Sequence, residues 1–179
     1  MIEELDMHLL DLVQNAFTAG STRVDVSVVC DETTDRLIIS VSDNGTRMDA
    51  QTLETVRRGY YSSKSEKSVG LGIPLLRETA QHCDGRFAIE SKQGEGTTVT
   101  AEFRRSHVDL PPFGDLAASF LNIVVTADAC YVRITYQCDG NELELDTAAL
   151  SEMLGDLSFQ HPEVIRFLKA YIEERVNTG

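Results

Sequence analysis

The chain has 179 residues, enough for one domain or for one domain and a small second unit. Apolar residues make up 42% of it and charged residues 25%, as in ordinary soluble globular proteins. The net charge of −13 argues against binding to nucleic acid or to an anionic membrane, because a phosphate backbone needs a basic partner surface. Residues 1–6 carry no basic segment and no apolar run is long enough to span a membrane, so we expect a cytoplasmic protein.

Four cysteines lie at positions 30, 83, 130 and 138, and no two of them form a CxxC pair. In a cytosolic protein this pattern favours reduced, buried thiols over metal or redox roles. We therefore expect no disulfide bond in the fold.

The first predicted element is an amphipathic helix over residues 3–19, in which apolar side chains recur at helical spacing. His8, Asp11 and Asn15 fall three and four residues apart, so they share one face of this helix. That face is either solvated or functional. Because asparagine is a poor helix former and Asn15 borders the apolar stripe, we favour a functional role.

A hairpin follows, with strands predicted over residues 24–29 and 37–43 from the alternation of apolar and polar residues. The second strand stops at Asp43, and Asn44-Gly45 indicates a turn. The Asp43 carboxylate is therefore held at the end of a rigid strand, where the glycine lets the backbone approach a flat ligand.

The middle of the chain combines helices, strands and one long loop. Residues 59–69 are rich in serine and poor in large apolar residues, which predicts a mobile loop, and Gly70-Leu71-Gly72 then opens a helix. The elements expected here are helices over 49–58 and 73–83, strands over 86–91 and 97–104, and a hairpin turn at 93–96.

The pattern changes after a linker-like stretch at residues 110–114. Helices are expected over 115–121, 147–154 and 162–176, and a hairpin of strands over 131–136 and 142–145. Residues 1–108 thus form one predicted domain, and 109–179 form a C-terminal helix-hairpin-helix extension. From its amphipathicity, this small α+β unit either packs on the first domain or offers a surface for a partner or for self-association as a homodimer.

Three features of the first domain match the needs of a nucleotide. A glycine-rich helix start offers free backbone N–H groups and the positive end of a helix, which suit a phosphate. The amide oxygen of Asn15 can bind Mg²⁺, which prefers oxygen ligands and phosphates. The carboxylate of Asp43 can accept a hydrogen bond from an exocyclic amine such as that of adenine.

These motifs, in this order, resemble those of the GHKL superfamily of ATP-binding domains, which includes gyrase, heat-shock chaperone, histidine kinase and mismatch-repair ATPases. Residues 11–15 resemble the N box, 43–48 the first glycine box, 70–72 the second, and 94–99 the closing glycine–threonine segment. The resemblance implies a Bergerat-type α+β fold, a two-layer α/β sandwich whose mixed, mostly antiparallel sheet has helices on one face. The whole chain is also similar to small stand-alone histidine-kinase-like ATP-binding proteins associated with iron hydrogenase genes in anaerobic bacteria.

The resemblance implies ATP and Mg²⁺ as ligands and assigns roles by position. Asp43 would accept from the adenine amino group, and Asn15 would bind Mg²⁺ and phosphate. The positions assigned to the adenine pocket are Asp43, Gly45, Met48 and Thr97. The positions assigned to the phosphates are Asn15, Gly70, Leu71 and Gly72, with the lid cations Lys64 and Lys67. Five basic residues against three acidic ones within 47–67 support an anionic ligand, the alternative being a solvated charged loop.

Two positions depart from the family pattern. The N-box acid is usually glutamate in the hydrolysing members, whereas here it is Asp11, one methylene shorter, so as a general base it reaches its water less easily. The first glycine box has Arg47 where the family has its last glycine. Arg47 either weakens nucleotide binding, if the glycine served the backbone, or supplies a cation to the lid.

None of the four histidines lies in the helix-borne acceptor motif of a sensor kinase, so a kinase of this kind would phosphorylate a partner protein in trans, on histidine or serine. The alternatives are a non-catalytic ATP-sensing module that binds a partner according to nucleotide state, and a slow ATPase linked to dimerisation. Phosphoryl transfer depends mainly on positioning and metal, so the sequence does not separate the kinase from the sensor.

Overall fold

The computed structural model describes residues 4–46, 50–58, 72–92, 94–127 and 129–176. In chain order the elements are α1 (Leu5–Thr18), β1 (Arg23–Asp31), β2 (Arg36–Asp43), α2 (Ala50–Arg58), α3 (Gly72–His82), β3 (Arg86–Lys92), β4 (Gly96–Arg104), α4 (Leu116–Thr126), β5 (Tyr131–Cys138), β6 (Asn141–Asp146), α5 (Thr147–Leu154) and α6 (Pro162–Arg175). Within these ranges no helix is both long and apolar enough to cross a membrane.

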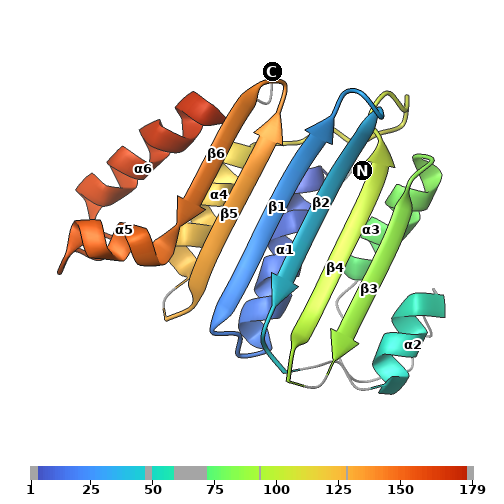
Figure 1. The fold of residues 1–179 in the computed structure, drawn as a ribbon, viewed down its shortest axis with the longest axis horizontal. Coiled ribbons are helices and arrows are strands. Elements are labelled where there is room, and N and C mark those ends of the chain that lie inside the picture. Colours follow the sequence, from blue (N-terminus) through green and yellow to red (C-terminus); the bar gives the residue numbers. More distant parts are fainter. Residues whose placement is uncertain (1–3, 47–49, 59–71, 93, 128, 177–179) are drawn as a thin grey trace.

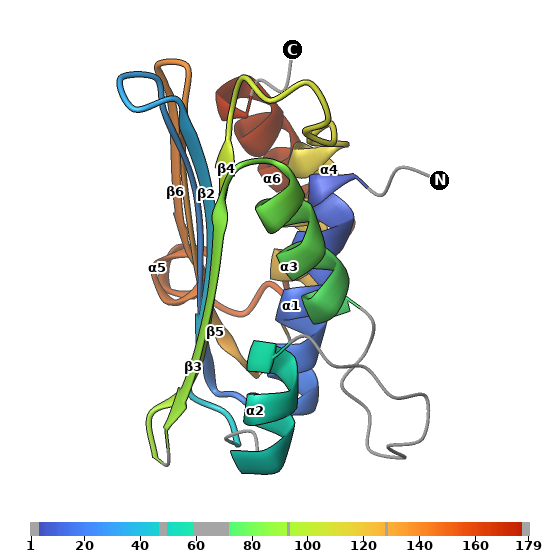
Figure 2. The ribbon, with the colours of Figure 1, turned by 90° about the vertical axis from the view of Figure 1, so that its right-hand side faces the viewer.

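Six strands form one sheet in the order β3-β4-β2-β1-β5-β6 (Figure 1). Every neighbouring pair is antiparallel except β1 and β5, which run parallel. Helices α1, α2, α3, α4 and α6 lie on one side of the sheet (Figure 2). The predicted α+β two-layer sandwich with a mixed, mostly antiparallel sheet is therefore confirmed.

The hydrophobic core fills the space between the sheet and the helices. The predicted alternation in the first hairpin is visible as burial, since Val24, Val26 and Val28 of β1 and every second residue of β2 are buried. Helix α1 covers these strands with an apolar stripe that includes Leu5, Leu9 and Leu12. At about 1.5–3 kcal/mol for each fully buried large aliphatic side chain, this packing holds the end of β2 in place.

The C-terminal residues continue the same sheet and core. Strand β5 pairs with β1, so that Val24 lies opposite Val132, and α4 packs against both α1 and α6. One cluster of buried apolar residues runs from Leu5 to Val176. The predicted hairpin and helices are present, and the division of the chain at residue 108 stays a prediction.

Helix α4 is longer than predicted, since it runs to Thr126 rather than to residue 121. Asparagine and four β-branched residues follow Leu121 within α4, and all five have weak helix propensity. Burial of Ile123 and Val124 in the core overrides that propensity, because tertiary packing of an apolar face supplies most of the stability of a helix in a protein.

The prediction of four reduced cysteines is wrong for two of them. Cys30 and Cys138 form a disulfide across 108 residues of sequence, while Cys83 and Cys130 are free. The pairing follows from the topology, because the parallel register of β1 and β5 runs to Val29 opposite Gln137 and the two cysteines come next in each strand. A CxxC search considers only short spacings and therefore does not detect such a pair.

Candidate functional site

A small cavity of about 70 Å³ lies between α1, the start of α3, and the ends of β2 and β4. The predicted site residues Asn15, Asp43 and Thr97 come together here from three different elements. The residues that line the cavity are Leu12, Asn15, Ala16, Ala19, Val41, Asp43, Thr46, Ile73, Thr97 and Val99. Its wall is thus mostly apolar with a few polar groups, as small-molecule sites usually are.

Asp43 has one carboxylate oxygen fixed by the protein. Its Oδ1 accepts from the hydroxyl of Ser21 at 3.0 Å and from the backbone N–H of Gly45 at 2.7 Å. No described residue forms a hydrogen bond or ion pair with Oδ2. The two bonds to Oδ1 orient the side chain, and Oδ2 is left to accept a hydrogen bond from a ligand.

Two glycines allow the backbone around Asp43 to pack closely. A Cβ on Gly96, whose φ is +87°, would lie 1.8 Å from the carbonyl oxygen of Asp43. A Cβ on Gly45 would lie 2.4 Å from Ser21 Oγ, so this glycine makes room for the hydroxyl that holds the carboxylate. Gly45 is not among the cavity-lining residues, and its direct contact with a ligand stays a prediction.

Ser21 and Asn44 are site residues that sequence reasoning missed. The Asn44 side chain accepts from the backbone N–H groups of Thr22 and Arg23, both at 2.9 Å, and donates to the Thr22 hydroxyl at 2.9 Å. It thereby ties the end of β2 to the start of β1. The sequence does not reveal either role. Asn-Gly indicates a turn whatever the asparagine side chain binds, and nothing in the sequence marks Ser21 beyond its place after a helix.

Helix α1 carries the two residues predicted for metal and hydrolysis. The Asn15 side chain is exposed at the cavity, and neither it nor Asp11 hydrogen-bonds to any described residue. Asp11 lies against the start of α3, since a Cβ on Gly72 would be 2.6 Å from its Oδ2. The third residue of that predicted face, His8, is buried instead.

The start of α3 supplies the predicted phosphate end of the site. The helix begins at Gly72, and Ile73 lines the cavity, so the positive N-terminal end of the helix lies next to α1. Thr97, opposite Asp43 in the register of β2 and β4, shares a hydrogen bond of 2.9 Å with Ser91. The predicted positions that lie outside the described residues are Arg47, Met48, Lys64, Lys67, Gly70 and Leu71.

A free thiol also lies near the carboxylate. Burial, and then the negative charge of Asp43, raise the pKa of Cys130. A raised pKa keeps cysteine in the thiol form, which is a poor nucleophile.

The sequence matches the family model described as histidine kinase-, DNA gyrase B-, and HSP90-like ATPase over residues 2–107. Over 99 residues it is 33% identical to the sensor histidine kinase YxdK of Bacillus subtilis, which covers 51% of this chain and 30% of the kinase. Over 101 residues it is 30% identical to the CAI-1 autoinducer sensor kinase/phosphatase CqsS of Vibrio cholerae, covering 56% of this chain and 15% of that protein. The chain thus spans less than a third of the length of these two relatives.

Among solved structures, the N-terminal domain of a DNA repair protein superposes with a TM-score of 0.54 at 15% identity. The match covers 80% of this chain and 52% of that one, and at this identity it speaks for the fold alone. The family match spans more than half of the chain and includes α1, the end of β2, the start of α3 and β4. The chain belongs to the histidine kinase-, DNA gyrase B-, and HSP90-like ATPase family, the GHKL superfamily.

Proposed function

We propose that the chain binds ATP with Mg²⁺ in the cavity beside α1 and phosphorylates or regulates a partner protein in trans. The observation that carries the proposal is the Asp43 carboxylate, which Ser21 and Gly45 fix through Oδ1 while none of the residues that the structure describes bonds to Oδ2. An acceptor held in this way at the end of a strand suits the exocyclic amine of adenine. Thr97 and the apolar wall around Val41 and Val99 support the ring.

The phosphates belong at the opposite end of the site, at the start of α3. Free backbone N–H groups at Gly72, together with Gly70, Leu71 and the cations Lys64 and Lys67, would bind them. Mg²⁺ would be held by the amide oxygen of Asn15 and by the phosphates, and when bound it neutralises phosphate charge during transfer. The exposed Asn15 amide, which has no partner among the described residues, fits this role.

The relatives named as sensor kinases support phosphoryl transfer over a purely structural role for ATP. None of the four histidines in these 179 residues lies in an acceptor motif, which supports a phosphoacceptor outside them. Asp11 lies at the phosphate end but is one methylene shorter than the usual glutamate, which favours transfer or sensing over rapid hydrolysis. Incubation with labelled ATP and the native cell extract tests this: a labelled partner supports the kinase, and tight ATP binding without transfer supports the sensor.

Asp43→Asn should remove the preference for ATP over GTP. The carboxylate accepts from the amino group of adenine and repels the carbonyl of guanine, whereas an amide can donate to that carbonyl. We expect a loss of about 1–3 kcal/mol in selectivity, the cost of an unpaired buried polar group. Competition titrations with ATP and GTP measure this selectivity. The control is Asp25→Asn, which makes the same charge change on the half-exposed face of β1, opposite the buried Val24 and Val26. Equal binding of ATP and GTP by the parent protein would show that Asp43 does not recognise adenine.

Asn15→Ala should abolish the Mg²⁺-dependent part of ATP affinity and leave the fold intact, because Asn15 is an exposed side chain on α1. Titrations of ATP with Mg²⁺ and with a chelator measure that part directly. Gln14→Ala removes an exposed amide from the same helix on the side that faces α4, and should behave like the parent. An unchanged response to Mg²⁺ in Asn15→Ala would contradict the assignment.

A further inference from the structure

Helix α4 exposes a face without charge. None of its 11 residues, Leu116–Thr126, is charged, although the helix lies between α1 and α6 with part of its surface exposed. Ala118 and Asn122 are exposed, while Leu121 and Val125 are half-buried beside them. A surface helix normally turns charged residues to water, and one that is apolar on all sides is normally covered.

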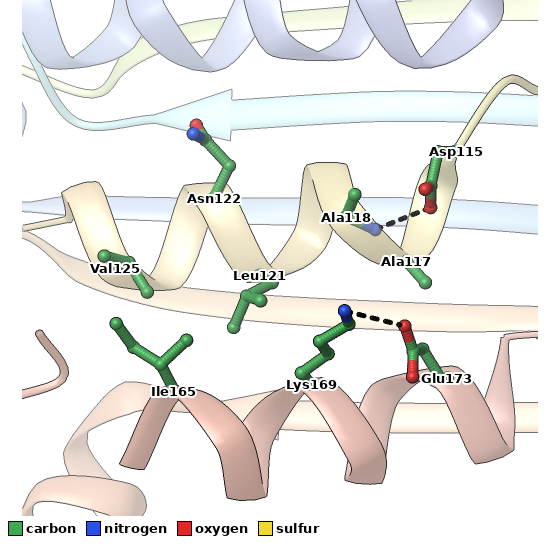
Figure 3. A pocket seen from close by; sticks show the side chains of 9 residues that line it. All are labelled: Asp115, Ala117, Ala118, Leu121, Asn122, Val125, Ile165, Lys169 and Glu173. Carbon is green, nitrogen blue, oxygen red and sulfur yellow. Dashed lines mark hydrogen bonds and ion pairs between the residues drawn. The ribbon is translucent and has the colours of Figure 1, made fainter. Parts of the chain in front are cut away.

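A groove of about 370 Å³ runs between α4 and α6. Figure 3 shows Leu121 and Val125 of α4 directed toward Ile165 of α6, which gives the groove an apolar floor. At one end stand Asp115 and the ion pair of Lys169 with Glu173 (Figure 3). The groove shares no lining residue with the cavity beside α1, so an occupant here would not overlap with a nucleotide bound there.

A second hollow of about 230 Å³ lies on the other side of α4, against α1. It is lined by Phe17 and Leu10 from α1 and by Asn122 and Thr126 from α4, so Asn122 borders both hollows. The exposed surface of α4, which includes Ala118 and Asn122, is therefore an uncharged ridge with a depression on each side. Side-chain ridges and grooves of this kind are the surfaces on which another helix packs.

The charge around the groove indicates what kind of helix could pack there. Residues 109–179 contain 12 acidic residues against 4 basic ones, so this part of the chain carries most of the net charge of −13. Among the groove-lining residues the one basic side chain, Lys169, is already paired with Glu173, and Asp115 adds a further negative charge. A second copy of the same acidic surface would be repelled, whereas a basic segment would be attracted.

We propose that the groove between α4 and α6 is a docking site for an amphipathic helix of a partner protein, with an apolar face and lysine or arginine at its flanks. The apolar face would lie over Leu121, Val125 and Ile165, and a basic residue would lie near Asp115 and Glu173. This is the helix-in-groove mode of recognition. It goes beyond the proposed ATP-dependent function and does not depend on it.

The test uses the full chain and a labelled synthetic peptide of about 16 residues, which is long enough to form a helix on a surface. The peptide has leucine at helical spacing and lysine at the other positions. A leucine–glutamate peptide of the same pattern, and a leucine–lysine peptide with alternating order, are the comparison probes. Ala118→Glu places a bulky acid in the groove at the third position of α4, where glutamate is well tolerated in a helix. Ala170→Glu makes the same change on an exposed position of α6 that does not line the groove.

The parent should bind the helical leucine–lysine peptide in preference to both comparison peptides. Ala118→Glu should weaken the affinity for this peptide at least tenfold, and Ala170→Glu should not weaken it. Attraction by charge alone would make both variants bind more tightly, which would overturn the proposal. So would failure of the parent to bind the peptide, or equal binding of the glutamate peptide. Sedimentation of the parent as a dimer that Ala118→Glu dissociates would assign the groove to a second copy and likewise overturn it.

Discussion

Gly96→Ala is expected to lower the free energy of unfolding by about 3 kcal/mol or more and to abolish nucleotide binding. Gly96 has a φ of +87°, and a Cβ there would lie 1.8 Å from the carbonyl oxygen of Asp43. That overlap is with backbone, so no side-chain rotation relieves it, and β4 must separate from β2. The separation displaces Asp43 from Ser21 and Thr97 from the cavity wall, so stability and binding are lost together.

Gly94→Ala in the same turn is the matched control. Gly94 also has a positive φ, +80°, but a Cβ there would meet no atom within 4 Å. We expect only the cost of a left-handed backbone, about 1–2 kcal/mol, with ATP affinity preserved. Urea unfolding and ATP titrations on both variants separate two costs: the backbone strain that both share, and the steric overlap with Asp43 that only Gly96→Ala introduces. Equal losses for the two variants would show that close packing on Asp43 is not what requires Gly96.

The sequence predicts the elements of this fold because their signals are local. Alternation over residues 37–43 identifies β2, and helical spacing over 3–19 identifies α1 within two residues of its ends. Neighbouring residues carry these periods, so no tertiary information is needed. The resemblance to the GHKL motifs then implies that Asn15, Asp43 and Thr97 converge, and they do line one cavity.

Other features depend on pairings between distant segments. The sequence does not show that Ser21 donates to Asp43, or that Asn44 holds the start of β1, because both contacts arise only when β1 and β2 are in register. The parallel pairing of β5 with β1 is equally hidden, since the two strands are separated by about 100 residues. The periodicity of residues 109–179 predicts their hairpin, but it does not show that this hairpin joins the sheet of the first domain.

The disulfide between Cys30 and Cys138 is the covalent counterpart of that pairing. Reduction should lower the free energy of unfolding by about 2–4 kcal/mol, because the bond closes a long loop and restricts the unfolded chain. ATP affinity should change little, since Cys30 lies at the far end of β1 from Arg23, where Asn44 ties β1 to the site. The reduced protein should therefore lose stability mainly by weaker association of β5 and β6 with the rest of the sheet.

Urea unfolding of the parent with and without a dithiol reductant measures this loss, and alkylation under denaturing conditions counts the free thiols. The Cys30→Ser/Cys138→Ser variant is the control, because it should match the reduced parent and show no response to reductant. Cys83 and Cys130 remain in that variant, so any response through them would appear there as well. Four alkylated thiols in the untreated parent, together with a stability that reductant does not change, would mean that β1 and β5 are held by hydrogen bonds and packing alone.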